Sequence, residues 1–201
     1  MSVDAKEMIT NLLDFYDLAD KTIIAVGAGG GQFIEYGRNA KKVIAIDNDE
    51  LALGKLKDNL VKAGLTEKFI MVNSDFYLAD QKGDVVIFEM SLHEMHDPAL
   101  AVKHAFTLAP EVLVLDHWKD SEWLYIIDEK EKVIRSWTAL EVFKPIKFKQ
   151  YDTFEFFYDY EELCEMIKGQ GQTAISRTTP YKSKQRFTIP FTYALCLVTA
   201  P

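Results

Sequence analysis

The sequence predicts an α/β protein with a doubly wound, mostly parallel sheet that has helices on both faces. Two observations favour this class. Five short apolar runs, typical of strands buried on both faces, alternate with helical patterns through the first 117 residues. Each run is also followed by glycines or polar residues, and the carboxyl ends of parallel strands are where such sheets bind ligands. With 201 residues, we expect a single domain over residues 1–201.

The first half of the chain supplies clear element boundaries. Asp4 and Glu7 have capping-box spacing, Gly64 is a typical helix stop, and Asp97-Pro98 is a cap followed by proline in the first turn. We expect helices over residues 4–18, from about 32, over 49–63 and from 98, and strands over 22–26, 42–46, 69–73, 85–88 and 112–115.

The second half is richer in aromatic residues. Ser121 is expected to cap one long helix that keeps helical spacing as far as Leu140, and Pro145 closes this region. The aromatic stretch 151–158 follows, then a short helix at about 160–168. Two final strands are expected near 173–178 and 191–198.

The segment "AVGAGGGQF", residues 25–33, places four glycines directly after the first strand. A glycine-rich turn lets backbone approach a nucleotide closely, and Asp47, twenty residues after Gly27, suits a carboxylate that binds ribose hydroxyls. The dinucleotide pattern GxGxxG fails at Gln32, and no Gly-Lys-Ser/Thr follows, which excludes a P-loop. A tight turn without a ligand is the alternative, but the acidic strand ends argue against it.

Four segments in order, "IIAVGAGGG", "VIAIDND", "NSDF" and "DVVIFEMSLHEMHDP", resemble the successive motifs of class I S-adenosylmethionine (SAM)-dependent methyltransferases. The resemblance covers nearly the whole chain. It implies a seven-stranded sheet whose last strand is antiparallel. It also implies a methyltransferase that uses SAM, releases S-adenosylhomocysteine and methylates a small molecule.

Carried over residue by residue, the resemblance implies that Asp47 holds the ribose and that Asp75 accepts from the adenine amino group. The family usually has an acidic residue two positions before the first glycine, where this chain has Ala25; Glu89 is a candidate replacement. The implied cofactor residues are Gly27, Ala28, Gly29, Gly31, Asp47, Asn48, Asp75, Phe76, Glu89 and Met90.

His93 and His117 follow neighbouring strands and are the candidate catalytic bases, since a histidine pKa lies near neutrality. The alternative is that the histidines after the fourth strand only bond loop backbone. Metal binding by His93, Asp116 and His117 would resemble catechol methyltransferases, but their pattern of acidic ligands is not visible, so we expect no metal.

A substrate cover is expected over about residues 118–160, where related small-molecule enzymes place one. Aromatic rings there could wall an apolar acceptor and face the sulfonium. The alternative is that they pack the long helix onto the sheet. The candidate substrate residues are Trp118, Tyr151, Phe154, Phe156 and Phe157.

Charge and composition indicate which kinds of binding partner and which cellular compartment to expect. The net charge of −8 disfavours nucleic acid, whose binding depends on phosphate neutralisation, and no run is long enough to span a membrane. Two cysteines without metal-ligand spacing, and no apparent signal peptide, favour the cytoplasm. A homodimer is left open. So is a SAM-binding protein that does not transfer methyl groups; a nicotinamide oxidoreductase has no use for Asp75.

Overall fold

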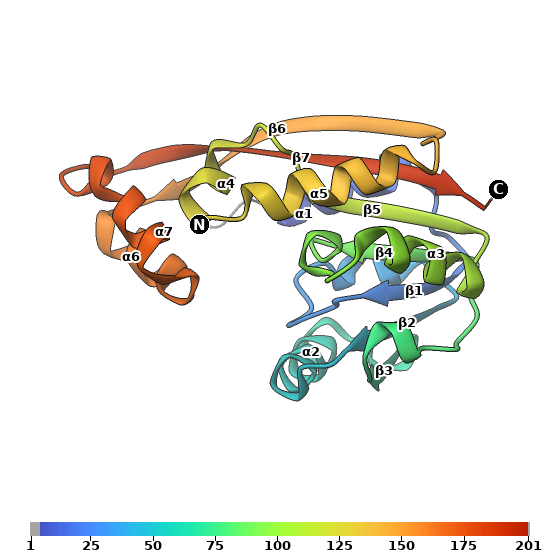
Figure 1. The fold of residues 1–201 in the computed structure, drawn as a ribbon. Coiled ribbons are helices and arrows are strands. Elements are labelled where there is room, and N and C mark those ends of the chain that lie inside the picture. Colours follow the sequence, from blue (N-terminus) through green and yellow to red (C-terminus); the bar gives the residue numbers. More distant parts are fainter. Residues whose placement is uncertain (1–4, 201) are drawn as a thin grey trace.

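The computed structural model describes residues 5–200, which contain one seven-stranded sheet (Figure 1). The strands are β1 (Thr22–Val26), β2 (Lys42–Asp47), β3 (Phe69–Asn73), β4 (Val85–Glu89), β5 (Glu111–His117), β6 (Lys147–Phe157) and β7 (Phe187–Thr199). Their order across the sheet is β3-β2-β1-β4-β5-β7-β6. The first five run parallel and β7 is antiparallel to both its neighbours, which confirms the predicted fold class.

The strand order reverses between β1 and β4. The chain proceeds from β1 outward to β2 and β3, then returns to β4 on the other side of β1. Ala25 pairs with Ala45 of β2 on one side and with Ile87 of β4 on the other, and all three are fully buried. The connections leave a crevice outside the carboxyl ends of β1 and β4, which is where ligands of such sheets bind.

Helices cover both faces: α3 and α5 lie in front of the sheet in Figure 1 and α1 lies behind it. Their bounds are α1 (Ala5–Phe15), α2 (Glu50–Ala63), α3 (Pro98–Leu108), α4 (Glu122–Ile127), α5 (Lys130–Glu141), α6 (Tyr160–Ile167) and α7 (Gly171–Arg177). Within the described range, every helix is too short or too polar to cross a lipid bilayer.

The expected caps of α2 and α3 are present. Asp49 accepts from the N–H groups of Leu51 and Ala52, and Asp97 accepts from that of Leu100. Gly64 ends α2 in the left-handed conformation. Asp4, the expected first cap, lies outside the described residues.

Two helix predictions were wrong. The glycines lead into a short 3-10 helix, Ile34–Arg38, and not an α-helix; within it Gly37 lies against Phe69 and the Tyr36 hydroxyl donates to Glu89. The long helix after Ser121 is broken at Asp128, which adopts φ 63° and ends α4. Its carboxylate pairs with Arg177 at 2.7 Å, so a tertiary contact accompanies the break. The Ser121 hydroxyl accepts from the N–H of Thr192 and does not cap α4.

Two further assignments differ in the last third. The aromatic stretch 151–158, for which no strand was expected, lies in strand β6 as far as Phe157 and pairs with β7 over that range. Residues 173–178, expected as a strand, lie mostly in α7. Short apolar runs are ambiguous between the two states, and here Ala174 is buried among helices.

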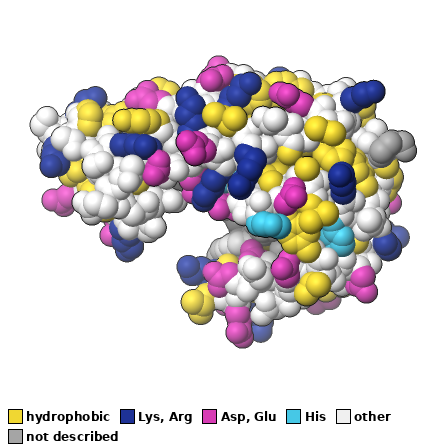
Figure 2. All heavy atoms as spheres, in the orientation of Figure 1, with side chains coloured by type: hydrophobic (Ala, Val, Ile, Leu, Met, Phe, Trp, Pro, Cys, Tyr) yellow, Lys and Arg dark blue, Asp and Glu magenta, His cyan; other side chains and the backbone are white. Residues whose placement is uncertain are grey.

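Strand β7 is longer than its neighbour β5. Strand β5 pairs with residues 193–199, and the earlier half of β7 extends beyond it as a ribbon with β6. Helices α6 and α7 are carried at the far end of this ribbon (Figure 1). The surface is hollowed between this lobe and the body of the sheet (Figure 2).

The turn after β1 is shaped by a close contact with the segment after β4. Gly27 has φ +69°, and a Cβ atom there would lie 2.4 Å from Cβ of Ser91. The Ser91 hydroxyl in turn donates to the carbonyl of Val26 at 2.7 Å. Gly27 is therefore required by the fold itself, before any ligand is considered.

Replacing Gly27 by alanine should destabilise the protein more than replacing Gly64. Gly64 has a similar φ of +67° but nothing within 4 Å of its Cβ position, so Gly64→Ala measures the left-handed strain alone, about 1–2 kcal/mol. Gly27→Ala should lose about 1–3 kcal/mol more from the clash with Ser91. Urea unfolding measures both; equal losses would contradict the contact.

Candidate functional site

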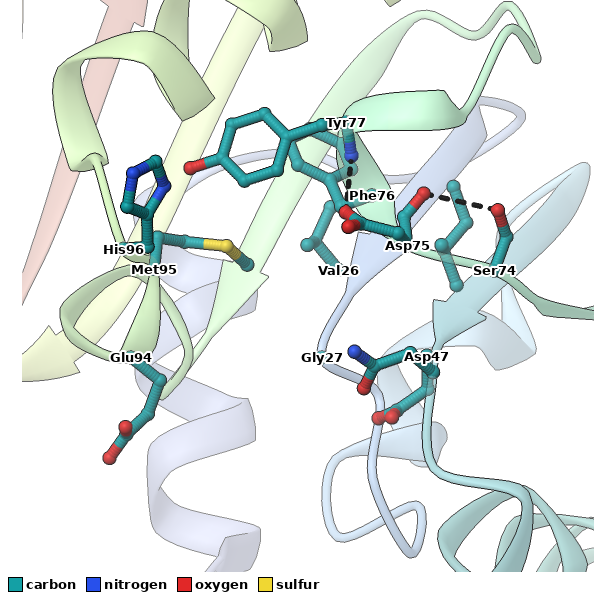
Figure 3. A pocket seen from close by; sticks show the side chains of 12 residues that line it. Val26, Gly27, Asp47, Ser74, Asp75, Phe76, Tyr77, Glu94, Met95 and His96 are labelled. Atoms are coloured by element: carbon teal, nitrogen blue, oxygen red, sulfur yellow. Dashed lines mark hydrogen bonds between the residues drawn. The ribbon is translucent and has the colours of Figure 1, made fainter.

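An open pocket lies at the carboxyl ends of β1, β2 and β3 (Figure 3). Its lining comes from residues 26–27, 46–48, 74–77 and 94–96. Five of the ten cofactor residues expected from sequence line it, namely Gly27, Asp47, Asn48, Asp75 and Phe76. Ala28, Gly29, Gly31, Glu89 and Met90 do not line it, although all follow β1 or β4 at the same edge of the sheet.

Asp47 organises the glycine turn. Its Oδ2 accepts from the N–H of Gly29 at 2.8 Å and its Oδ1 from that of Asp49 at 2.9 Å. Each carboxylate oxygen has two acceptor sites, so the side chain keeps acceptor capacity toward the pocket while it fixes the backbone beside it. Gly31 is held against α2, where a Cβ atom would lie 2.7 Å from Leu56.

The opposite wall begins with Asp75, whose Oδ1 accepts from the N–H of Tyr77 and caps a 3-10 turn. Phe76 is buried with its ring edge-on to Phe88 at 5.4 Å. The Tyr77 hydroxyl donates to the carbonyl of Asp97 at 2.9 Å, which ties this wall to the loop that carries residues 94–96. Tyr77 was missed from sequence, and residues 94–96 were not assigned to the pocket although they lie within the fourth quoted motif.

The segment after β4 combines a buried acid with a strained residue. Burial raises the pKa of Glu89 to about 7, against the hydrogen bond that Tyr36 donates to it. Met90 adopts φ 52°, a conformation that L-residues rarely take. Such strain is concentrated at functional sites.

His93 and His117 lie together, as their strand positions predicted, with ring centroids 5.4 Å apart. Burial lowers the pKa of His93, but the Asp116 carboxylate 2.6 Å from Nδ1, helped by Glu129 and Glu94, outweighs it and raises the pKa to about 11. Burial lowers the pKa of His117 to about 4. In the absence of a bound ion the carboxylates therefore favour the protonated form of His93, which weighs against its expected role as a base.

The expected substrate residues do not gather at the pocket. Tyr151 stacks on Tyr193 at 5.1 Å, and Phe157 is fully buried, stacked on Trp123. Phe154 is exposed, and Phe156 lies edge-on to Tyr158. Trp118 packs on Trp137 and Phe148 beside a separate apolar hollow. For Phe157 the packing alternative is correct, because a side chain with no exposed surface cannot touch a substrate.

The buried Glu89 should make stability depend on pH. Its pKa of about 7 in the folded state lies above the ordinary 4.5, so the protonated form stabilises the protein fully below pH 4.5. This contribution is lost as the pH rises through 7, by about 1.4 kcal/mol per pH unit. Relative to wild type, Glu89→Gln should show a flatter profile between pH 4.5 and 7 in urea unfolding. The exposed Glu67→Gln is the control and should follow the wild type.

Comparison with known proteins finds a methyltransferase domain in the chain. Residues 24–110 match the family model described as a methyltransferase domain. No curated protein is similar enough in sequence to count as a relative. Among solved structures, a candidate methyltransferase of Bacillus halodurans is 16% identical, with a TM-score of 0.69 over 98% of this chain and 99% of that chain.

Two further structures share the fold. A SAM-dependent methyltransferase of Aquifex aeolicus is 16% identical, with a TM-score of 0.58 over 98% of this chain and 90% of that one. A candidate RNA methyltransferase of Pyrococcus horikoshii is 17% identical, with a TM-score of 0.60 over 97% and 82%. At these identities the structures establish the fold, and the matched domain covers the strands that form the pocket. Part of the chain therefore matches a methyltransferase domain, and its fold is the one that these solved methyltransferase structures share.

Proposed function

We propose that the protein transfers the methyl group of SAM to a small-molecule acceptor by in-line displacement and releases S-adenosylhomocysteine. The observation that carries this proposal is the pocket in which Asp47 and Asp75 line facing walls beside the glycine turn. In-line transfer from a sulfonium needs alignment and exclusion of water more than it needs catalytic groups.

In this proposal the nucleoside lies between those walls. Asp47 accepts from the ribose hydroxyls with the lone pairs that the backbone leaves open, and Asn48 lies beside the adenine. Asp75 accepts from the adenine amino group, and the N–H of Phe76 donates to a ring nitrogen. All four residues line the pocket, which supports the assignment.

The methionine end is assigned to the glycine turn and the segment after β4. Ala25 is fully buried and offers no carboxylate for the amino group of SAM. Glu89 ends β4, the neighbour of β1, and Tyr36 holds its side chain in place. We assign Glu89 to the amino group and Met90 to the floor beneath the sulfonium.

The acceptor is assigned to the side of the pocket formed by residues 94–96. The net charge of −8 favours a small molecule over nucleic acid, although one structural neighbour is named as an RNA methyltransferase. Because Asp116 occupies Nδ1 of His93 and raises its pKa, we do not assign it the role of a base. His117, with its pKa of about 4, would be a weak one.

Replacing Asp47 should weaken SAM binding without unfolding the protein. Loss of a charged acceptor of the ribose hydroxyls corresponds to about 1.5–3 kcal/mol, or roughly 10- to 150-fold in Kd. Isothermal titration with SAM measures Asp47→Asn against Asp49→Asn, a control two residues away in which Asn can still cap α2. Equal affinity in the two variants would contradict the assignment.

Turnover separates methyl transfer from SAM binding without transfer, which would use the same pocket. A screen of small metabolites should find one acceptor that makes the wild type release S-adenosylhomocysteine and makes Asp47→Asn release less at subsaturating SAM. A screen in which SAM binds but no acceptor raises release would favour the binding protein.

A further inference from the structure

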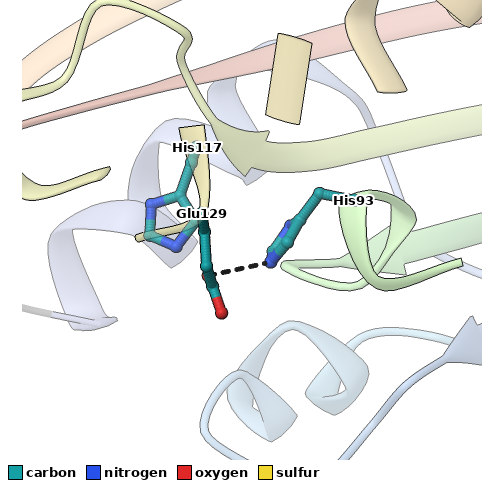
Figure 4. A group of neighbouring side chains, drawn as sticks. All are labelled: His93, His117 and Glu129. Carbon is teal, nitrogen blue, oxygen red and sulfur yellow. Dashed lines mark ion pairs between the residues drawn. The ribbon is translucent and has the colours of Figure 1, made fainter. Parts of the chain in front are cut away.

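Three buried side chains from separate parts of the chain converge beside the pocket (Figure 4). His93 lies in the turn after β4, His117 ends β5, and Glu129 lies at the break between α4 and α5. Their exposed fractions are 3%, 9% and 7%. One ring nitrogen of each histidine and one Glu129 oxygen lie within 4.8 Å of one another.

Asp116 fixes the orientation of the His93 ring. Its Nδ1 lies 2.6 Å from Oδ1 of Asp116, and its backbone N–H donates to Oδ2 of the same carboxylate at 3.1 Å. Asp116 is fully buried. Histidines that bind metals commonly donate their other ring N–H to a carboxylate in this way, which fixes the ring and directs the remaining nitrogen at the ion. Nε2 of His93 thus faces the cluster.

The distances around Nε2 are unusual for hydrogen bonds. Oε2 of Glu129 and Oε1 of Glu94 each lie 3.4 Å from it, beyond the normal N–H···O range of about 2.7–3.2 Å. Two ligands of one tetrahedral Zn²⁺, each bonded at about 2.0–2.1 Å, are roughly 3.3 Å apart. The oxygens stand where a cation shared with Nε2 would hold them.

The next contacts concern His117. Its Nδ1 is buried and finds no hydrogen-bond partner among the described residues. The Trp137 indole N–H donates to the carbonyl of His117 at 2.6 Å, so the backbone that carries the ring is held. In Figure 4 the ring nitrogen of His117 that lies toward Glu129 is Nε2, whereas Nδ1 lies on the other side of the ring, so Nε2 is the nitrogen available to the cluster.

The charges around the cluster leave room for a cation. The carboxylates of Asp116, Glu94 and Glu129 face it, against the more exposed Lys132, which lies 2.9 Å from Glu94 and 3.5 Å from Glu129; His93 binds an ion through Nε2 in its neutral form. An ion-pair network without metal is the competing explanation. It accounts for the carboxylates but not for the approach of a ring nitrogen of His117 to within 4.8 Å of the other ligand atoms.

We propose that His93, His117 and Glu129 bind a divalent transition-metal ion, with Zn²⁺ the best match to two imidazoles and a carboxylate. This departs from the expectation of no metal, because the ligand Glu129 is distant in sequence. Glu94 or an exogenous oxygen or sulfur completes the coordination. Glu94 also lines the cofactor pocket, so an acceptor hydroxyl or thiol could bind the ion; this last consequence rests on the proposed function.

The test is titration of the full chain, freed of metal with a chelator, with Zn²⁺ by calorimetry. The wild type should bind one equivalent, and Glu129→Gln and His117→Gln should bind at least about 10-fold more weakly. Glu131→Gln and His96→Gln, exposed neighbours outside the ligand set, should bind like the wild type. Circular dichroism verifies that each variant is folded.

Substituting Co²⁺ in the wild type gives a readout that needs no variant, since tetrahedral nitrogen and oxygen coordination produces visible absorption bands. Absence of Zn²⁺ binding, equal binding by ligand and control variants, or a Co²⁺ spectrum of the hydrated ion would each overturn the proposal. A parallel titration with SAM keeps the two questions apart. Zn²⁺ binding without SAM binding would uphold the metal site and refute the proposed function, and the converse would do the reverse.

Discussion

The close approach of the turn after β1 to the segment after β4 is the constraint on which the rest of the molecule depends. Gly27 has no side chain because Ser91 fills that space, and the Ser91 hydroxyl bonds the carbonyl of Val26. This contact fixes the position of the glycine turn relative to the segment after β4. That segment reaches His93 two residues after Ser91. The cofactor pocket and the histidine cluster therefore share one fixed point at the switch in strand order.

Burial and the position of the Asp116 carboxylate explain why the pKa values of two neighbouring histidines shift in opposite directions. In a medium of low dielectric an ionised group persists only when a partner compensates it. Asp116 lies 2.6 Å from His93 and compensates its charge. Asp116 accepts from the backbone N–H of His117 at 2.8 Å, but burial is the largest influence on the His117 ring and lowers its pKa to about 4. The positions of the two histidines in the sequence predicted that they lie together, but their pKa values depend on the groups that surround each ring.

Glu89 follows the same physics with a different outcome. It is as deeply buried as His93, but its hydrogen-bond partner is the neutral hydroxyl of Tyr36, so its pKa rises to about 7. The carboxyl is therefore poised near neutrality, where a cationic amino group nearby would favour its ionised form. A buried acid at the end of β4 thus compensates in charge for the alanine at position 25.

The sequence by itself determined the alternation of five buried strands with helices, the caps at Asp49 and Asp97, and the acidic residues at the strand ends. These follow from local rules: apolar periodicity, capping hydrogen bonds and the meeting of parallel strand ends at one edge. The tertiary structure alone decided that residues 171–177 form a helix, that the helix after Ser121 breaks at Asp128, and that the stretch 151–157 pairs with β7. It also brought Glu129 to His93 and His117 and fixed their charges. Each of these depends on contacts between residues far apart in the chain, whose free energies outweigh the weak local preferences of short segments.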